Sequence, residues 1–317
     1  MSQPPQFEVT VIIPAYNRSG TIARAVQSAL AQGRAVQKVL VIDDGSTDNT
    51  AEHVSLLAAE DSRVTLIRKS NAGASSARNL GIALSRTPWI AFLDSDDEWI
   101  PGRLDNIHKL LHSSPYLEFI HGNKVDLNPA GEILEDRRRT FSPERAQQHS
   151  FLLANMQIKT STVLIRRDLV SKEEPWFREN LKTCEDYEFF WRMILKTNGI
   201  GYDPEENVLI HHTRASLMDQ TTEISKLRDN LLARHHLVSS TTFHKSKNKK
   251  LKNIVYHGMV QEVKNLLGSA RKISFSNAFK QAMWINNNIN YNPFIPYIAI
   301  KFRQKSMSFV KVIFLRR

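Results

Sequence analysis

Short apolar runs alternate with amphipathic segments along the first ninety residues of the chain. Each apolar run has the length of a strand that is buried on both faces. These runs span residues 9–13, 39–42, 64–67 and 89–93. The segments between them predict helices, as where apolar residues recur at helical spacing from Ile22 to Leu30. The alternation predicts a Rossmann-like, doubly wound and mostly parallel α/β sheet flanked by helices.

Acidic residues directly follow two of these strands. The fourth strand leads into Asp-Ser-Asp-Asp (94–97), and the second into Asp-Asp (43–44). Side chains alternate along extended backbone, so Asp94 and Asp96 should point toward one common point, where a hard divalent cation would relieve their repulsion. Ligands of open α/β sheets bind beyond the carboxyl ends of the strands, so both acidic groups should line one edge, where a nucleotide could lie. The alternative is a solvated turn with Asp97 as a helix cap, which does not need three acids.

The glycine motifs that cradle phosphates in other nucleotide-binding proteins are missing. The chain contains neither Gly-x-Gly-x-x-Gly nor Gly-x-x-x-x-Gly-Lys-Ser/Thr. This absence argues against a dinucleotide-dependent oxidoreductase and against a P-loop NTPase.

Four short motifs do stand out. They are V-I-I-P-A-Y-N at 11–17, V-I-D-D-G-S-T-D at 41–48, N-A-G at 71–73 with A-R-N at 77–79, and F-L-D-S-D-D at 92–97. In this order and spacing they resemble the motifs of family 2 glycosyltransferases, which are inverting enzymes of the GT-A fold. The resemblance is specific over residues 9–114, continues to about residue 215 and then fades.

The resemblance implies a nucleotide-sugar donor, usually uridine-linked. Pro14, Tyr16 and Asp44 would hold the base and ribose, and Arg78 would lie near the base or the diphosphate. Residues 94–96 would be the family's Asp-x-Asp, followed by Asp97 beside the sugar. The expected donor-binding set is Pro14, Tyr16, Asn17, Asp43, Asp44, Arg78, Asp94, Ser95 and Asp97.

The same resemblance implies a divalent cofactor, Mg²⁺ or Mn²⁺, with Asp96 as the metal-side carboxylate. Asp94 is the second expected ligand, and His212 is a further candidate because related enzymes often carry a histidine in this region. A bound cation would neutralise the charge that develops on a diphosphate leaving group. Mg²⁺ commonly uses only one or two carboxylates together with substrate phosphates and waters, which suits so sparse a site.

A second stretch with candidate chemistry spans residues 183–193. Phe189, Phe190 and Met193 make an apolar face at helical spacing, and Glu185 and Asp186 fall in the first turn of that helix. Taken alone, acids at a helix start favour the positive end of the dipole. An inverting transfer needs a base for the acceptor hydroxyl, and the resemblance assigns that role to Asp186, with Glu185 orienting the base or the acceptor.

The single cysteine, Cys184, excludes an intrachain disulfide and fits a reducing compartment. It is expected to be a packed residue and not a nucleophile, because inversion needs no covalent intermediate. Residues 117–125 and 161–165 predict further strands, and 136–139 a solvated loop. The sequence names no acceptor contact in 115–182.

Charge is distributed unevenly along the chain. The net charge is +11, yet residues 243–317 hold 15 Lys/Arg and one acid while residues 1–242 hold 28 Lys/Arg and 31 acids. The tail predicts helices at 219–238, 247–268 and 274–286, with a boundary near 240–250. Its basic amphipathic end, with an apolar stripe at Ile298, Phe302, Phe309 and Ile313, is typical of binding to an anionic membrane surface. A helix packed on the catalytic domain is the alternative. Nucleic acid is not expected as a partner.

We therefore expect a GT-A catalytic domain at 1–218, with donor binding at 9–114 and the acceptor side and base at 115–218, and a helical basic region at 219–317. No signal peptide and no membrane span are predicted, so the expected location is cytoplasmic, peripheral on the inner face of the membrane. Lack of the Gln-x-x-Arg-Trp motif favours a non-processive transferase that adds one sugar to a saccharide or lipid-linked saccharide during surface polysaccharide synthesis. The alternatives are a nucleotidyltransferase on a similar sheet and a non-catalytic basic protein that binds membrane or nucleic acid.

Overall fold

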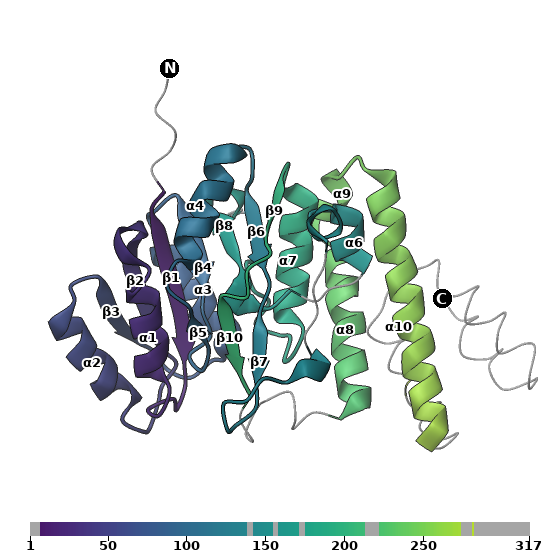
Figure 1. The fold of residues 1–317 in the computed structure, drawn as a ribbon. Coiled ribbons are helices and arrows are strands. Elements are labelled where there is room, and N and C mark those ends of the chain that lie inside the picture. The colour runs from purple at the N-terminus through teal and green to yellow at the C-terminus, as the bar shows by residue number, and fades with distance from the viewer. Residues whose placement is uncertain are drawn as a thin grey trace, which may run out of the picture.

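A seven-stranded sheet forms the centre of the protein (Figure 1). The computed structural model describes residues 7–137, 142–154, 158–170, 175–212, 222–273 and 281. In sheet order the strands are β3 (Val64–Arg68), β2 (Val36–Asp43), β1 (Val9–Ala15), β4 (Trp89–Phe92), β8 (Leu164–Arg166), β6 (Phe119–Gly122) and β9 (Ile200–Asp203). Strands β1 to β4 are parallel, whereas β8 runs antiparallel to both of its neighbours, β4 and β6. The predicted doubly wound, mostly parallel sheet is confirmed.

Helices cover both faces of this sheet, because the side chains of each strand alternate between two apolar cores. On β1, Val11 and Ile13 join one core, whereas Ile12 joins the other. The first core includes α1 (Ile22–Leu30), α2 (Thr50–Glu60) and α4 (Arg103–Ser113). The second includes α3 (Ala74–Leu84), α6 (His149–Ala154), α7 (Glu185–Lys196), α8 (Glu223–Val238), α9 (Thr241–Lys245) and α10 (Lys249–Ile273). Short helical turns complete the described chain: η1 (Gly33–Ala35), η2 (Glu135–Arg137), α5 (Pro143–Ala146), η3 (Thr160–Thr162) and η4 (Arg167–Leu169).

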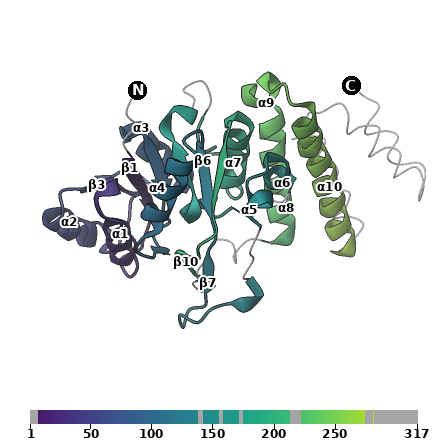
Figure 2. The same cartoon turned by 45° about the horizontal axis from the view of Figure 1, so that its top comes forward.

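A second, three-stranded sheet lies below the first in Figure 2, with strand order β5 (Glu98–Trp99), β10 (Val208–His211) and β7 (Val125–Leu127). The single strand predicted over 117–125 is therefore wrong. Residues 119–122 pair with β9 in the large sheet, and 125–127 pair with β10 in the small one. The strand predicted over 161–165 starts later, at Leu164, because residues 160–162 form a helical turn.

The C-terminal helices pack against the rest of the protein. Leu231 of α8 and Val255 of α10 are fully buried in the same core as Phe190 of α7, and α7, α8 and α10 lie side by side in Figures 1 and 2. The region near 240–250, where a boundary is predicted, holds α9, whose Phe243 is buried. The helix predicted over 274–286, apart from Gln281, and the apolar stripe near the end of the chain lie outside the described residues.

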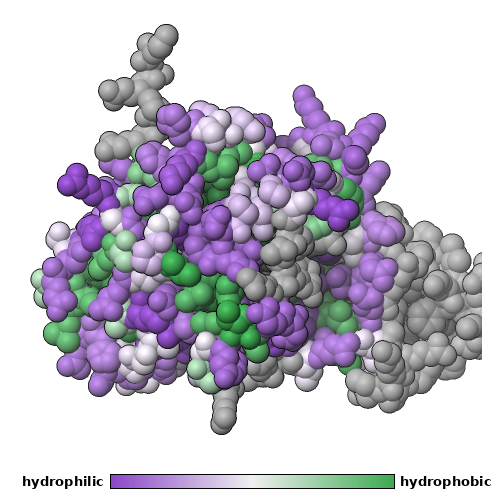
Figure 3. Space-filling model, in the orientation of Figure 1, coloured by the Kyte–Doolittle hydropathy of each residue, from purple (hydrophilic) through white to green (hydrophobic). Residues whose placement is uncertain are grey.

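Hydrophilic residues predominate on the face of the molecule drawn in Figure 3, and hydrophobic ones form small separate patches. The most exposed large apolar side chains, such as Leu56 and Tyr116, come from elements far apart in the sequence. None of the helices in the described part of the chain is long and apolar enough to cross a bilayer.

Close packing of α3 on β1 gives a test of the core. A Cβ atom added at Gly81 would lie 2.4 Å from Cγ2 of Ile12, which is fully buried in the central strand. Gly81→Ala should therefore lower the free energy of unfolding, because overpacking costs about 1–3 kcal/mol and better helix propensity returns at most about 1 kcal/mol. Urea denaturation measures the difference. Gly20→Ala is the matched control, since nothing lies within 4 Å of a Cβ there; equal stability of the two variants would contradict the packing argument.

Candidate active site

The two acidic groups meet at one edge of the large sheet. In the strand register, Ala15 at the end of β1 pairs with Asp43, and Ile12 pairs with Phe92, two residues before Asp94. Because β1 lies between β2 and β4, both acidic groups flank the segment that follows β1. This arrangement is the one predicted from the strand order.

The loop after β1 is tied to the loop after β2. Asn17 adopts a left-handed conformation, with φ of 51°. Its backbone N–H donates to Ser46 Oγ at 3.0 Å, and its side-chain oxygen accepts from the N–H of Thr47 at 2.9 Å. The N–H of Arg18 donates to Thr50 Oγ1 at 2.7 Å. Asn17 thus joins two loops in this structure, and its contact with the donor stays a prediction. Its neighbour Tyr16 is 46% exposed, while Pro14 is buried within β1.

Asp43 and Asp44 are buried and fully engaged. Asp43 accepts from the N–H of Ser46 at 2.9 Å and from Arg68 Nε at 2.9 Å. Asp44 accepts from Lys69 Nζ at 2.6 Å and from the backbone N–H groups of the loop before α3, at Ala72 and Gly73. In this structure both carboxylates organise loops, so a contact of Asp44 with a nucleotide would replace one of these partners.

The cluster after β4 is organised around Ser161, which precedes β8. Its Oγ donates to Asp97 and accepts from the N–H of Asp94 at 3.1 Å. Asp97 is 95% buried, and burial together with the charges of Asp94 and Asp96 raises its pKa well above the usual value. Burial and the charge of Asp94 also raise the pKa of Asp96. The side chains of Asp94 and Asp96 remain 33% and 27% exposed. Ser95, the middle residue of the motif, is buried.

The carboxylate oxygens of this cluster fit a hard divalent metal ion. Asp94 and Asp96 present carboxylate oxygens to solvent, and oxygen is the ligand that Mg²⁺ and Mn²⁺ prefer. Among the residues that the structure describes, no three His, Cys, Asp or Glu side chains converge as a closed metal site. Two accessible carboxylates suit a cation that takes its remaining ligands from phosphates and water.

Of the two histidines at the end of β10, His211 lies next to this cluster. Its backbone N–H donates to Asp97, and its ring lies 3.3 Å from Glu98 Oε2. The ring of His212 instead lies 2.7 Å from Asp126 Oδ1. Neighbouring side chains of a strand point to opposite sides, which separates the two rings. His212 as a metal ligand stays a prediction.

Arg78 connects the acidic cluster to the second predicted pair. This side chain from α3 donates to Asp94 Oδ1 at 2.8 Å and to Glu185 Oε1 at 3.0 Å. Its guanidinium lies over the ring of Phe177, 5.3 Å from the centroid, and is 7% exposed. The two carboxylates raise its pKa above the usual arginine value, against the effect of burial. Glu185 and Asp94 therefore lie on either side of the Arg78 guanidinium, and both are bonded to it.

Asp186 is the neighbour of Glu185 in the first turn of α7, which begins after Cys184 in a left-handed conformation, with φ of 62°. Burial and the charge of Glu185 raise the pKa of Asp186 to about 7, against the opposing charges of Arg78 and Lys159. Asp186 as a whole keeps an intermediate exposure. A carboxyl group with such a pKa can accept a proton at neutral pH. Burial also raises the pKa of the Cys184 thiol to about 12, so a reactive thiolate is not expected there.

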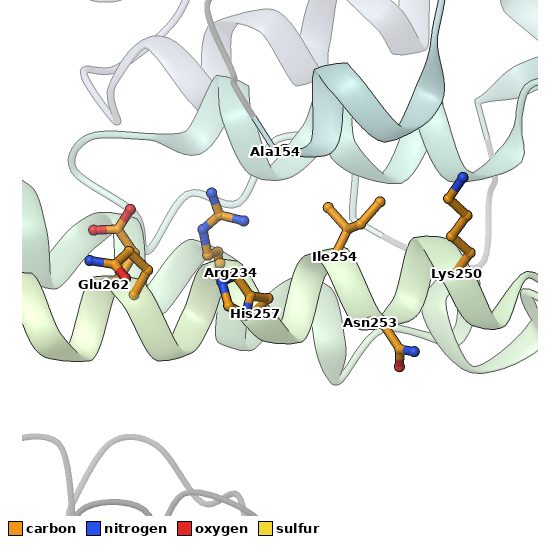
Figure 4. Close-up of a pocket in the computed structure, with 9 residues that line it drawn as sticks. Ala154, Arg234, Lys250, Asn253, Ile254, His257 and Glu262 are labelled. Carbon is orange, nitrogen blue, oxygen red and sulfur yellow. The ribbon is translucent and has the colours of Figure 1, made fainter. Parts of the chain in front are cut away.

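A cavity of about 740 Å³ lies elsewhere, between α6, α8 and α10 (Figure 4). Arg234, Lys250 and Glu262 are among the residues that line it, and none of the predicted site residues does. The candidate active site is therefore defined by converging side chains at the sheet edge and not by this cavity. Sequence reasoning missed Ser161 and Phe177 because nothing local marks a serine or a phenylalanine for contact with residues more than sixty positions away.

The fold is similar to those of solved GT-A glycosyltransferases, and this similarity defines the fold class of the chain. The structure of S. aureus TarS in complex with UDP-GlcNAc superposes with a TM-score of 0.70 at 17% identity, covering 88% of this chain and 79% of that one. The mannosyltransferase PcManGT from Pyrobaculum calidifontis, in complex with GDP-Man and Mn²⁺, superposes with a TM-score of 0.59 at 17% identity, covering 92% and 82%. The predicted GT-A fold is confirmed.

The chain belongs to glycosyl transferase family 2, whose sequence profile matches residues 10–172. An Escherichia coli relative, the UDP-Glc:alpha-D-GlcNAc-diphosphoundecaprenol beta-1,3-glucosyltransferase WfgD, is 34% identical over 200 residues, which are 62% of this chain and 72% of that protein. The succinoglycan biosynthesis protein ExoU of Rhizobium meliloti is 34% identical over 207 residues, covering 62% and 58%. An uncharacterized glycosyltransferase of Rickettsia felis is 32% identical over 194 residues, and this chain spans only 31% of its length. Membership of this family favours a glycosyltransferase over a nucleotidyltransferase.

Removing the Arg78 guanidinium, which lies between Asp94 and Glu185, should destabilise the fold. Arg78→Met leaves Asp94 and Glu185 without their buried partner, and breaking a buried ion pair costs about 3–5 kcal/mol. We expect the lower end, about 3 kcal/mol, because Asp94 is one-third exposed. Urea denaturation of the variant measures this loss. The exposed Arg86→Met is the control, and a similar small loss in both variants would contradict the role of Arg78.

Proposed function

We propose that this protein is a metal-dependent, inverting, non-processive glycosyltransferase. It moves one sugar from a nucleotide-sugar donor, of which a UDP-sugar is the first candidate, to a hydroxyl of a saccharide or lipid-linked saccharide. Asp186 is the base, Glu185 orients the base or the acceptor, and the cluster after β4 binds the diphosphate end of the donor. The observation that carries this proposal is the bridge from Asp94 through Arg78 to Glu185. This bridge connects the acidic cluster after β4 to Glu185 and its neighbour Asp186, the proposed base.

The chemistry follows from that neighbourhood. The acceptor oxygen attacks the anomeric carbon from the face opposite the leaving group, and the bond from that carbon to the diphosphate oxygen breaks. The proton of the acceptor hydroxyl passes to the Asp186 carboxylate as the new bond forms. Arg78 holds Glu185 and lowers the repulsion between Glu185 and Asp94 during this step. A divalent cation bound at Asp94 and Asp96 would supply charge neutralisation to the departing diphosphate.

Other features support the identities of donor and acceptor. WfgD is named for transfer of glucose from UDP-Glc to a lipid diphosphate-linked sugar, and ExoU for a role in polysaccharide biosynthesis. TarS binds UDP-GlcNAc, whereas PcManGT binds GDP-Man. Tyr16, which is 46% exposed beside the sheet edge, offers a ring for a nucleobase. The basic C-terminal end would bring the enzyme to an anionic inner membrane surface where a lipid-linked acceptor resides.

The metal assignment predicts a loss of cation-dependent donor binding. In the wild-type protein, UDP together with Mn²⁺ should raise the melting temperature more than UDP alone, because a ligand that binds the native state stabilises it. Asp96→Ala should abolish this additional shift and the Mn²⁺-stimulated hydrolysis of the donor. Parallel measurements with GDP and dTDP identify the nucleotide. A variant that keeps the full Mn²⁺-dependent shift would remove Asp96 from the metal site.

The base assignment predicts a characteristic pH profile. Because a base must be ionised and the pKa of Asp186 is raised to about 7, kcat should rise about tenfold per pH unit below this value and level off above it. Asp186→Asn should lower kcat by ~10²–10⁴-fold and leave donor affinity unchanged. The exposed Asp105→Asn is the control and should keep wild-type rates. If donor affinity fell as far as kcat, Asp186 would be a binding residue instead.

A further inference from the structure

Two arginines pair with the acidic cluster, and they differ sharply in exposure. Arg78 is 7% exposed and is held by Asp94, Glu185 and the ring of Phe177. Arg18, from the loop after β1, places its Nε 3.6 Å from Asp96 Oδ2, and its side chain is 34% exposed. Arg78 is therefore a fixed part of the site, whereas the Arg18 side chain can leave Asp96 without opening a core.

The backbone that carries Arg18 is itself held firmly. Besides the bond from the Arg18 N–H to Thr50, the N–H of Ser19 donates to Asp48 Oδ2 at 3.0 Å. Hydrogen bonding to Thr50 and Ser19 lowers the pKa of Asp48 to about 2 although burial opposes this, so Asp48 stays charged at neutral pH. A movement of Arg18 thus involves its side chain and not the loop. The side chain swings from an anchored point beside the predicted diphosphate position.

Asp96 has a second arginine neighbour with a different function. Arg24 NH2 donates to the backbone carbonyl of Asp96 at 2.6 Å, and its Nε lies 3.7 Å from Glu98. Arg24 therefore fixes the peptide of Asp96 and leaves the carboxylate to Arg18. Among the described residues, Arg18 is the cation that forms an ion pair with the Asp96 carboxylate, while the charge of Arg24 acts on this carboxylate from its position at the peptide.

The energies of the two interactions favour replacement of the Arg18 guanidinium by a divalent metal ion at Asp96. An ion pair between groups that are each about one-third exposed contributes only about 0.2–1 kcal/mol. A divalent cation carries twice the charge and binds carboxylate oxygen directly. Once displaced, the guanidinium remains anchored at the same sheet edge, and it is well suited to donating to phosphate oxygens.

We propose that Arg18 occupies the place of the cation on Asp96 in the free protein and binds the donor diphosphate after a divalent cation has displaced it. This inference rests on the proposed function, because it requires a nucleotide diphosphate and a metal at the same site. In this proposal Arg18 is a positioning residue that contacts Asp96 first and the donor diphosphate second. Arg18 offsets the charge of Asp96 before the donor arrives and adds a phosphate contact afterwards.

The test exploits effects of opposite sign in one variant. In Arg18→Met the competitor for Asp96 is gone, so calorimetric titration with Mn²⁺ alone should show about two- to fivefold tighter binding. Titration with UDP at saturating Mn²⁺ should show about ten- to hundredfold weaker binding, the usual effect of losing a charge-assisted hydrogen bond to phosphate. A set of titrations with GDP covers the other nucleotide. Arg18→Lys keeps the charge and should recover part of the nucleotide affinity.

Arg34→Met is the matched control. Arg34 is exposed in the turn before β2, at the opposite end of that strand, and its loss removes the same charge without touching the cluster. Both affinities should equal those of the wild-type protein. If Arg18→Met left the Mn²⁺ affinity unchanged or weakened it, or left nucleotide affinity unchanged, this inference would be overturned while Mn²⁺-dependent nucleotide binding by the wild-type protein upheld the proposed function. A wild-type protein that bound neither Mn²⁺ nor a nucleotide would overturn both.

Discussion

Repulsion between carboxylates is the constraint around which this protein is organised. Arg78 donates hydrogen bonds to Asp94, sixteen positions away in the sequence, and to Glu185, which is 107 positions away, and its positive charge offsets theirs. Without a buried cation between them, the acids at the end of β4 and those at the start of α7 would destabilise each other. One side chain from α3 therefore allows the two groups of acids to lie close together. It also fixes the electrostatic setting of Asp186, whose pKa reflects burial and Glu185 on one side and Arg78 on the other.

The first half of the fold could be predicted from the sequence because its signals are local. Apolar runs give the four parallel strands, and the rule that ligands bind beyond their carboxyl ends gives the meeting of the two acidic groups. The second half could not be predicted as well. The chain leaves the large sheet at Asn123, whose N–H is bonded to Asp203, and no local signal says that residues 125–127 join another sheet. The role of Ser161 depends in the same way on where β8 inserts.

The individual site residues show the same limit. Asp44 and Asn17 are expected to touch the nucleotide, and the structure shows that they also organise loops through Lys69, Ser46 and Thr47. The family motif marks such residues without saying whether they act on the ligand or on the backbone around it. The basic character of the tail likewise describes its surface, whereas its apolar residues, such as Leu231 and Val255, join the core of the catalytic part. Charge composition alone could not separate those two contributions.

The position of β8 has a consequence for how the protein can be divided. This strand, at residues 164–166, is hydrogen-bonded between β4 and β6, so a segment from beyond residue 160 completes the sheet next to the acidic cluster. A fragment that ended after α4 would leave β4 with an open edge and Asp97 without Ser161. Residues 9–114 are contiguous in sequence, but their strands need β8 to complete the sheet. Engineering that transplants residues 9–114 would therefore have to transfer residues 161–166 with them.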